Sequence, residues 1–245
     1  MKTLLFTLIA FPLLAIQALA LDQSHSTWDE IVSKRVKGDS FDYAGLKKDR
    51  EPLDGYLGDL AKVKSSEYGK WSESEKLAFL INLYNAATVR LIVDHYPVKS
   101  IRDIGGKEGP WKEPVVSVFG KKVTLDHVEH EMIRAKFAEP RIHFAVNCAS
   151  VGCPPLRNEA FTGAKLERQL SDQTKDFLTD RDVNRLKGKT LTLSPLFDWF
   201  KGDFAKSAGS VEKYVAPYFP ESERKRILAG VTLKFGEYDW SLNGR

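Results

Sequence analysis

The stretch from Leu77 to Val93, LAFLINLYNAATVRLIV, is apolar on almost every face of a helix. Just before it, Ser72 and Glu75 have the spacing of a capping box, in which each side chain bonds the other residue's backbone amide. Pro97 follows the stretch and ends the helical pattern. A helix with no polar face cannot turn one side toward water, so this stretch predicts the buried central helix of the domain.

Around this helix, the sequence indicates more helices than strands. Val115 to Phe119 and Lys121 to Thr124 flank Gly120 and predict a hairpin, and a helix is expected from Leu125 to about Phe137. Short strands in hairpins or isolated pieces favour an α+β fold over a doubly wound sheet. We therefore expect one compact α+β domain over residues 21–245, with a buried central helix and a small, mainly antiparallel sheet.

The C-terminal third has the pattern of a scaffold. Its aromatic side chains are expected to pack in the core or as a lid; they are Phe197, Trp199, Phe200, Phe204 and Trp240.

Residues 1–20 have the order of a secretory signal peptide. Lys2 precedes an uncharged apolar stretch from Leu4 to Leu19, and the small residues Ala18 and Ala20 suit cleavage after Ala20. We expect a periplasmic or secreted protein with no membrane attachment beyond the signal peptide, and cleavage itself stays open. The net charge of +4 is too small, and the lysines too scattered, to indicate nucleic-acid binding.

The only two cysteines, Cys148 and Cys153, lie in RIHFAVNCASVGCPPL, from Arg141 to Leu156. The apolar run from Ile142 to Val146 predicts a strand that leads into their loop. Two nearby thiols in an oxidising compartment form a disulfide unless they are kept apart or reduced. The pair is therefore either a structural bond or a reactive site, in which Cys148 is the nucleophile and Cys153 can resolve an intermediate.

A nucleophilic Cys148 needs a base, and His130 is the preferred candidate. His130 lies beside the apolar stripe of the predicted helix, and Glu129 lies in the middle of it, where a carboxylate is costly unless paired. Glu129 is therefore either half of a structural ion pair or a group that orients His130. His143 would face away from Cys148 on a strand, so it is the poorer base. His143 and Ser150 are assigned to ligand binding.

Asn82 and Asn85 lie three positions apart on one face of the central helix. Buried carboxamides must bond something, and loop backbone is the simpler interpretation. Alternatively, Asn82 binds a ligand and Asn85 orients a catalytic group. A zinc site could be drawn from His127, His130, His143 and Cys148, but the histidines lack the spacing of a zinc-binding helix, so we predict no metal and no cofactor.

Several motifs together resemble the family called domain of unknown function 547. They are FLINLYNA (79–86), HYPVKSIRDI (95–104), LDHVEHEMIR (125–134), RIHFAVNCASVGCPPL (141–156), SPLFDWFKGDF (194–204) and YDWSLN (238–243). The family occurs as exported bacterial proteins and as a C-terminal domain of plant proteins, some fused to a glutaredoxin-like domain. The resemblance implies a link to thiols or glutathione. By analogy, the set of Cys, His and Glu or Asn residues indicates a papain-like or transglutaminase-like fold. In this copy Asn147 precedes Cys148, where a small apolar residue is expected.

Two functions are consistent with these residues. The first is a cysteine-dependent hydrolase or acyltransferase acting on an amide, peptide or thiol compound, with Cys148, His130, and Glu129 or Asn85 as its catalytic groups. The second is a non-catalytic module that binds a small molecule or peptide, such as a glutathione-like thiol, and carries a structural or redox-switch Cys148–Cys153 disulfide.

Overall fold

The computed structural model describes residues 21–244, and the predicted signal peptide lies outside them. Helix α5 (Glu73–His95) forms the centre of the structure and starts with the capping box of Ser72 and Glu75. From Leu77 to Val93 every side chain except Arg90 is buried. The helix is long and apolar enough to cross a membrane, but 89% of its apolar stretch is buried inside the protein. The prediction of a central core helix is confirmed.

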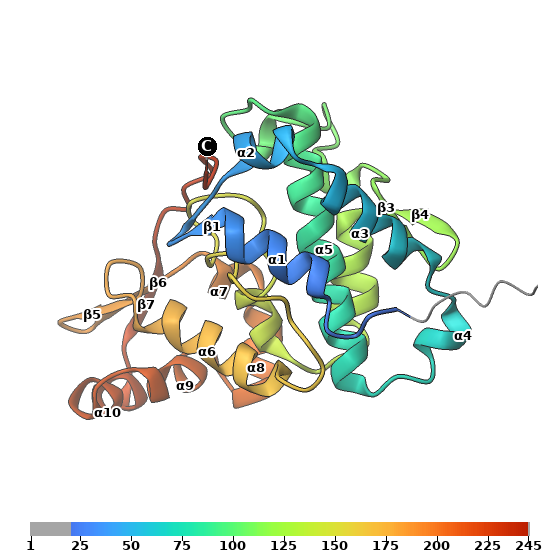
Figure 1. The fold of residues 1–245 in the computed structure, drawn as a ribbon. Coiled ribbons are helices and arrows are strands. Elements are labelled where there is room, and N and C mark those ends of the chain that lie inside the picture. Colours follow the sequence, from blue (N-terminus) through green and yellow to red (C-terminus); the bar gives the residue numbers. More distant parts are fainter. Residues whose placement is uncertain (1–20, 245) are drawn as a thin grey trace, which may run out of the picture.

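The other helices are α1 (Ser26–Arg35), α2 (Tyr43–Lys48), α3 (Glu51–Lys62), α4 (Ser65–Tyr68), α6 (Leu166–Thr179), α7 (Leu196–Trp199), α8 (Lys201–Ala208), α9 (Val211–Val215) and α10 (Glu221–Ala229). The strands are β1 (Val36–Lys37), β2 (Ser40–Phe41), β3 (Val116–Val118), β4 (Lys121–Val123), β5 (Arg185–Lys187), β6 (Thr190–Leu193) and β7 (Thr232–Phe235). Single-turn 3₁₀ helices are η1 (Ile101–Asp103), η2 (Pro110–Lys112), η4 (Pro140–Phe144) and η5 (Ala216–Tyr218), and η3 (His127–Arg134) is a π-helix. α2 and α3 pack against α5, and the elements from α6 to β7, coloured yellow to red, lie mainly to one side of it (Figure 1).

Strand pairing is mostly antiparallel, as expected for an α+β fold. β1 pairs with β2, β3 with β4 and β5 with β6 in antiparallel fashion, whereas β6 and β7 are parallel. The predicted hairpin is β3–β4, and its turn residues Phe119 and Gly120 have φ values of 50° and 74°. Two successive positive φ values give the turn whose twist matches a hairpin. The predicted fold class is confirmed.

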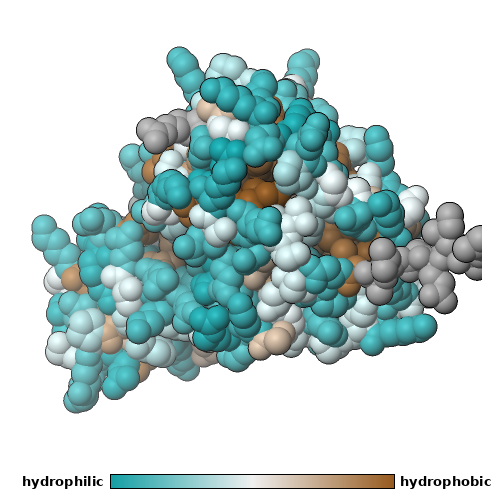
Figure 2. Space-filling view, viewed as in Figure 1, coloured by the Kyte–Doolittle hydropathy of each residue, from teal (hydrophilic) through white to brown (hydrophobic). Residues whose placement is uncertain are grey.

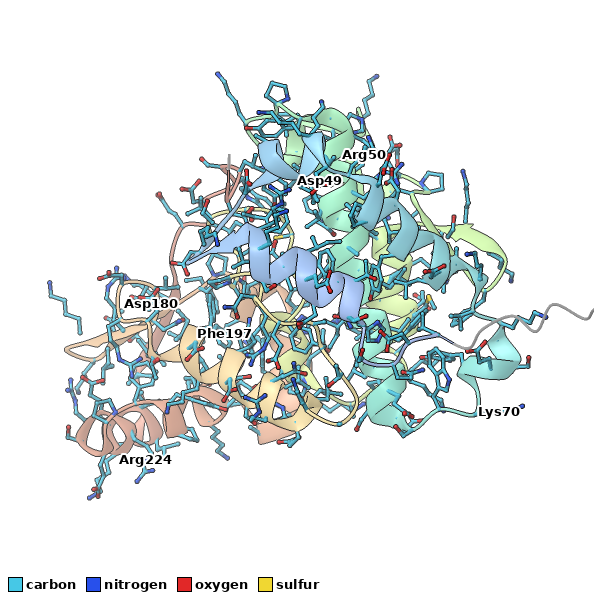
Figure 3. The ribbon with its side chains drawn as sticks, viewed as in Figure 1. Asp49, Arg50, Lys70, Asp180, Phe197 and Arg224 are labelled. Atoms are coloured by element: carbon cyan, nitrogen blue, oxygen red, sulfur yellow. The ribbon has the colours of Figure 1, made fainter. Side chains whose placement is uncertain are left out.

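Buried side chains form two clusters that meet near the cysteines. The larger cluster surrounds α5 and includes buried side chains of α1, α2 and α3. The smaller cluster lies among α6 to α10 and the β5–β6–β7 sheet. Phe197 lies inside the smaller cluster, whereas Arg224 of α10 points outward (Figure 3). Hydrophilic side chains cover most of the face seen in Figure 2, and hydrophobic ones show mainly in its recesses.

The predicted strand from Ile142 to Val146 is wrong. Pro140 to Phe144 form the 3₁₀ helix η4, with Pro140 at its first turn and the Glu139 side chain accepting the Arg141 amide. Proline at the first turn and a capping carboxylate favour a helical start, and they outweigh the apolar run. η4 joins the two cores, because Phe144 belongs to the smaller cluster and Ile142 to the larger.

The predicted helix after Thr124 exists, but its middle is a π-helix. An α-helical spacing would place Arg134 on the wet side with His127, yet Arg134 is half-buried and bonds Asp203. A π-helix has more residues per turn, so it rotates later side chains relative to an α-helix. Such segments occur frequently at functional sites.

Candidate functional site

A pocket of about 200 Å³ lies where the two cores meet, next to the cysteines. Its lining comes from six separate parts of the chain: Tyr84, Trp111, Asp126, Glu129, His130, His143, Val146, Cys148, Cys153, Leu196, Trp199, Phe200, Tyr238 and Trp240. Aromatic side chains dominate this lining, with Trp199 half-exposed at its edge. The site thus combines an apolar, aromatic wall with a few polar groups, as is usual for small-molecule pockets.

The cysteine loop is held in shape by Asn147 and the C-terminal segment. The Asn147 side chain donates to the Pro154 carbonyl at 2.8 Å and accepts the Ala149 amide at 2.9 Å. Gly152 donates its backbone N–H to the Asp239 carbonyl at 2.8 Å, and a Cβ on Gly152 would lie 2.9 Å from the Asp239 nitrogen. Asn147 therefore closes the loop from inside, which accounts for a polar residue before Cys148.

Ala149, directly after Cys148, has a φ of 58°. This left-handed conformation is uncommon for a residue other than glycine and is found frequently at functional sites. The turn places Cys148 at the pocket while the Ala149 amide is occupied by Asn147.

The two sulfur atoms lie 3.0 Å apart, and both cysteines are free. The backbone N–H of Cys148 donates to Cys153 Sγ at 3.1 Å. Tyr238 places its hydroxyl 3.0 Å from Cys148 Sγ, and Ser150 Oγ lies 3.3 Å from the same sulfur. Ser150, predicted as a binding residue, thus contacts the candidate nucleophile directly.

These contacts make the two thiols unequal. Hydrogen bonding by Cys153, then by Ser150 and Tyr238, lowers the pKa of Cys148 despite its burial. Burial, together with the neighbouring Cys148 sulfur, raises the pKa of Cys153 well above its usual range. Burial also raises the pKa of Tyr238, so its hydroxyl keeps its proton and can donate to the sulfur. Cys148 is therefore the thiol that ionises first.

Glu129 and His130 both line this pocket, but they have different partners. Glu129 is 7% exposed, and after burial its negative charge is the next cause that raises the pKa of the buried Tyr84 hydroxyl. His130 accepts a hydrogen bond at Nδ1 from Arg134 at 3.0 Å, because a guanidinium can only donate. No direct bond between His130 and Cys148 occurs among the described residues.

His143 lies deeper than His130, in η4. Its Nε2 is 2.8 Å from Asp203 Oδ2, and its ring stacks on Phe200 with centroids 3.8 Å apart. Arg134 completes the group by bonding both Asp203 oxygens, at 2.7 and 3.1 Å. The His143 hydrogen bond, followed by Arg134, lowers the pKa of Asp203, and burial lowers the pKa of His143.

Asn82 and Asn85 are outside the pocket lining and bond loop backbone. Asn82 donates to the Phe161 carbonyl at 2.7 Å and accepts the Phe161 amide at 3.0 Å. Asn85 donates to the Ala145 carbonyl at 2.9 Å and accepts the Asn147 amide at 2.8 Å. Both carboxamides thus attach α5 to the loops on either side of the cysteines.

Sequence reasoning missed Asp203, Tyr238, Tyr84 and Trp111 as members or neighbours of the site. Asp203 and Tyr238 lie 60 and 90 positions from their site partners His143 and Cys148. Both fall in motifs that carry the resemblance, and that was the available signal. In the part of the chain that the structure describes, no three His, Cys, Asp or Glu side chains are grouped for a metal ion.

The comparison with protein-family models agrees with the resemblance expected from the motifs. No curated protein matches the chain, and no solved structure matches it. The match to the family model begins before α5 and ends within α6, so Asp203 and Tyr238 lie beyond it. Residues 68–178, which hold the central helix and both cysteines, resemble the family described as Protein of unknown function, DUF547.

Proposed function

We propose that this protein is a thiol-dependent redox protein that reacts with a small sulfur compound through Cys148, with Cys153 as the resolving thiol. The observation that carries the proposal is the unequal pair of free thiols, with sulfurs 3.0 Å apart at an aromatic pocket. A disulfide bond is about 2.05 Å long, so a small movement closes it. The predicted signal peptide is consistent with work in the periplasm or outside the cell.

The reaction follows ordinary thiol–disulfide exchange. The Cys148 thiolate attacks one sulfur of a substrate disulfide, forming a mixed disulfide and releasing the other half as a thiolate, which takes up a proton. Cys153 then loses its proton and attacks Cys148 Sγ, which releases the second half of the substrate. The substrate is reduced to two thiols, the cysteine pair is oxidised to a disulfide, and an external thiol reductant restores it.

The pocket lining supports a substrate with an aromatic or apolar group beside its sulfur. Trp199, Tyr238 and Trp240 contact one another with centroid separations of 4.5 to 5.8 Å. Such rings favour stacking with a flat ligand. A space of about 200 Å³ suits a small molecule or one side chain of a peptide.

The test is the reaction of the protein with a small aromatic disulfide, followed by intact mass. Wild type should release both aryl thiols and lose the mass of two hydrogens, Cys153→Ser should retain one aryl group, and Cys148→Ser should not react in its folded form. Retention of the aryl group by wild type would remove Cys153 from the resolving role. Equal reactivity of the two single variants would contradict the proposal.

A hydrolase or acyltransferase is the second candidate, because Cys148, His130 and Glu129 line the same pocket. It has less support, since Arg134 occupies His130 Nδ1 and Asn147 occupies the Ala149 amide that could hold an oxyanion. Turnover of an aryl thioester by Cys153→Ser, lost in Cys148→Ser and His130→Gln, would favour it. A non-catalytic binding module would instead keep its ligand after both cysteines are replaced.

A further inference from the structure

The His143 ring is fixed on three sides. Its side chain is 0% exposed, its face stacks on Phe200, and Nε2 bonds Asp203 on α8. Arg134, from η3, holds Asp203 from the other side at 2.7 Å. A ring fixed in this way has a fixed tautomer, because the neighbour of one nitrogen decides where the proton sits.

Asp203 is paired with Arg134 and is ionised, so it can only accept, and His143 Nε2 must carry the proton. The lone pair of neutral His143 is therefore on Nδ1. That nitrogen is buried and has no hydrogen-bond partner among the described residues. A buried polar atom without a partner is costly, and in native proteins it calls for an explanation such as a catalytic role.

His130 differs in this respect. Its Nδ1 accepts from Arg134, so Nε2 carries the proton and faces Asp126 at 3.9 Å. Of the two histidines in this lining, His143 is therefore the one whose lone pair has no hydrogen-bond partner among the described residues. The charged groups acting on His143 are Glu129 and Arg134 from η3 and Asp203 from α8.

We propose that His143, rather than His130, accepts the proton that Cys148 loses, with Asp203 as its positioning residue; this rests on the proposed reactivity of Cys148. The Cys148 S–H bond breaks, the proton moves to His143 Nδ1, and the thiolate attacks the substrate sulfur. The Asp203 carboxylate stabilises the resulting imidazolium through Nε2–H, and the proton then passes to the departing thiolate. His143 and Cys148 line the same pocket without a direct bond, so the transfer requires one water molecule between them.

The test compares the rate of Cys148 alkylation by iodoacetamide across pH in wild type, His143→Gln, Asp203→Asn and Asp54→Asn. Asp54→Asn is the control, because Asp54 also pairs with arginines, Arg50 and Arg90, but is not part of this pocket's lining. We expect His143→Gln and Asp203→Asn to lower the rate near neutral pH by about tenfold, with the limiting rate at high pH unchanged. The control should follow wild type.

If the pH profiles of wild type, His143→Gln and Asp203→Asn superimpose while Cys148 still reacts, the role of His143 is overturned and the proposed function is not. A wild-type Cys148 that reacts no faster than a free thiol would instead refute the proposed function. If the variants do not fold, nitrogen NMR of labelled histidines in wild type decides. Alkylating Cys148 should then lower the pKa of His143, because the thiolate that stabilises the imidazolium is gone, and an unchanged titration would overturn the proposal.

Discussion

Tyr238→Phe removes one hydroxyl 3.0 Å from Cys148 Sγ and leaves the ring in place. A hydrogen bond to a charged group contributes about 1.5–3 kcal/mol. Ser150 Oγ now donates to the Tyr238 oxygen at 3.0 Å and lies 3.3 Å from the sulfur, so in the variant it can turn to Cys148 and offset part of the loss. A net cost of about 1.4 kcal/mol corresponds to a tenfold smaller thiolate population.

The assay is the rate at which iodoacetamide alkylates Cys148, measured from about pH 5 to about pH 9. This range spans the titration of a cysteine thiol. Tyr218→Phe is the matched control, because Tyr218 packs on the same smaller core but is outside the pocket lining. Tyr238→Phe should slow alkylation about tenfold at the acidic end and converge with wild type at the alkaline end. Equal rates throughout would refute the claim that this hydroxyl stabilises the thiolate.

Three further outcomes follow from the structure. Burial lowers the pKa of His25 from 6.5 to about 4. Between these two pH values the unfolded chain therefore binds a proton at His25, whereas the folded protein keeps His25 neutral. Stability should be complete above pH 6.5 and fall by roughly 3 kcal/mol toward pH 4 in urea titrations, and His25→Asn should reduce this slope. Asn82→Ala leaves the Phe161 amide and carbonyl without their partner and should lower the free energy of unfolding by about 2–4 kcal/mol, whereas an effect below 1 kcal/mol would contradict that role. Trp199→Ala should slow reaction with an aromatic disulfide about tenfold while leaving iodoacetamide alkylation unchanged, and equal slowing of both would argue against ring stacking.

The parts of the fold that sequence predicted are those set by local pattern. Leu77 to Val93 has no polar face, and Ser72 with Glu75 specifies its start, so the central helix needed no tertiary information. The β3–β4 hairpin likewise follows from Gly120 between two β-branched runs. These elements are confirmed because local and tertiary preferences agree.

The errors lie where the apolar pattern alone does not determine the structure. An apolar run of five residues cannot by itself distinguish a strand from a helical turn, and in η4 the proline and cap at its start were decisive. The π-helix η3 has no sequence periodicity that would distinguish it from an α-helix, so the inward position of Arg134 could not be predicted.

The candidate site was predicted only in part, for the same reason. Glu129, His130, His143 and Cys148 were selected as reactive side chains in apolar surroundings, and all four line one pocket. Asp203 and Tyr238 join them across the fold from positions that sequence reasoning assigned to scaffold.

The most direct test of the paired thiols is differential alkylation of Cys148 and Cys153 after equilibration in buffers of graded thiol–disulfide ratio. Both cysteines should lose and regain their labels together, at one ratio, through an intramolecular bond that forms reversibly in the folded protein. Cys148 and Cys153 that titrate independently, or a pair whose state never responds to the buffer, would contradict it.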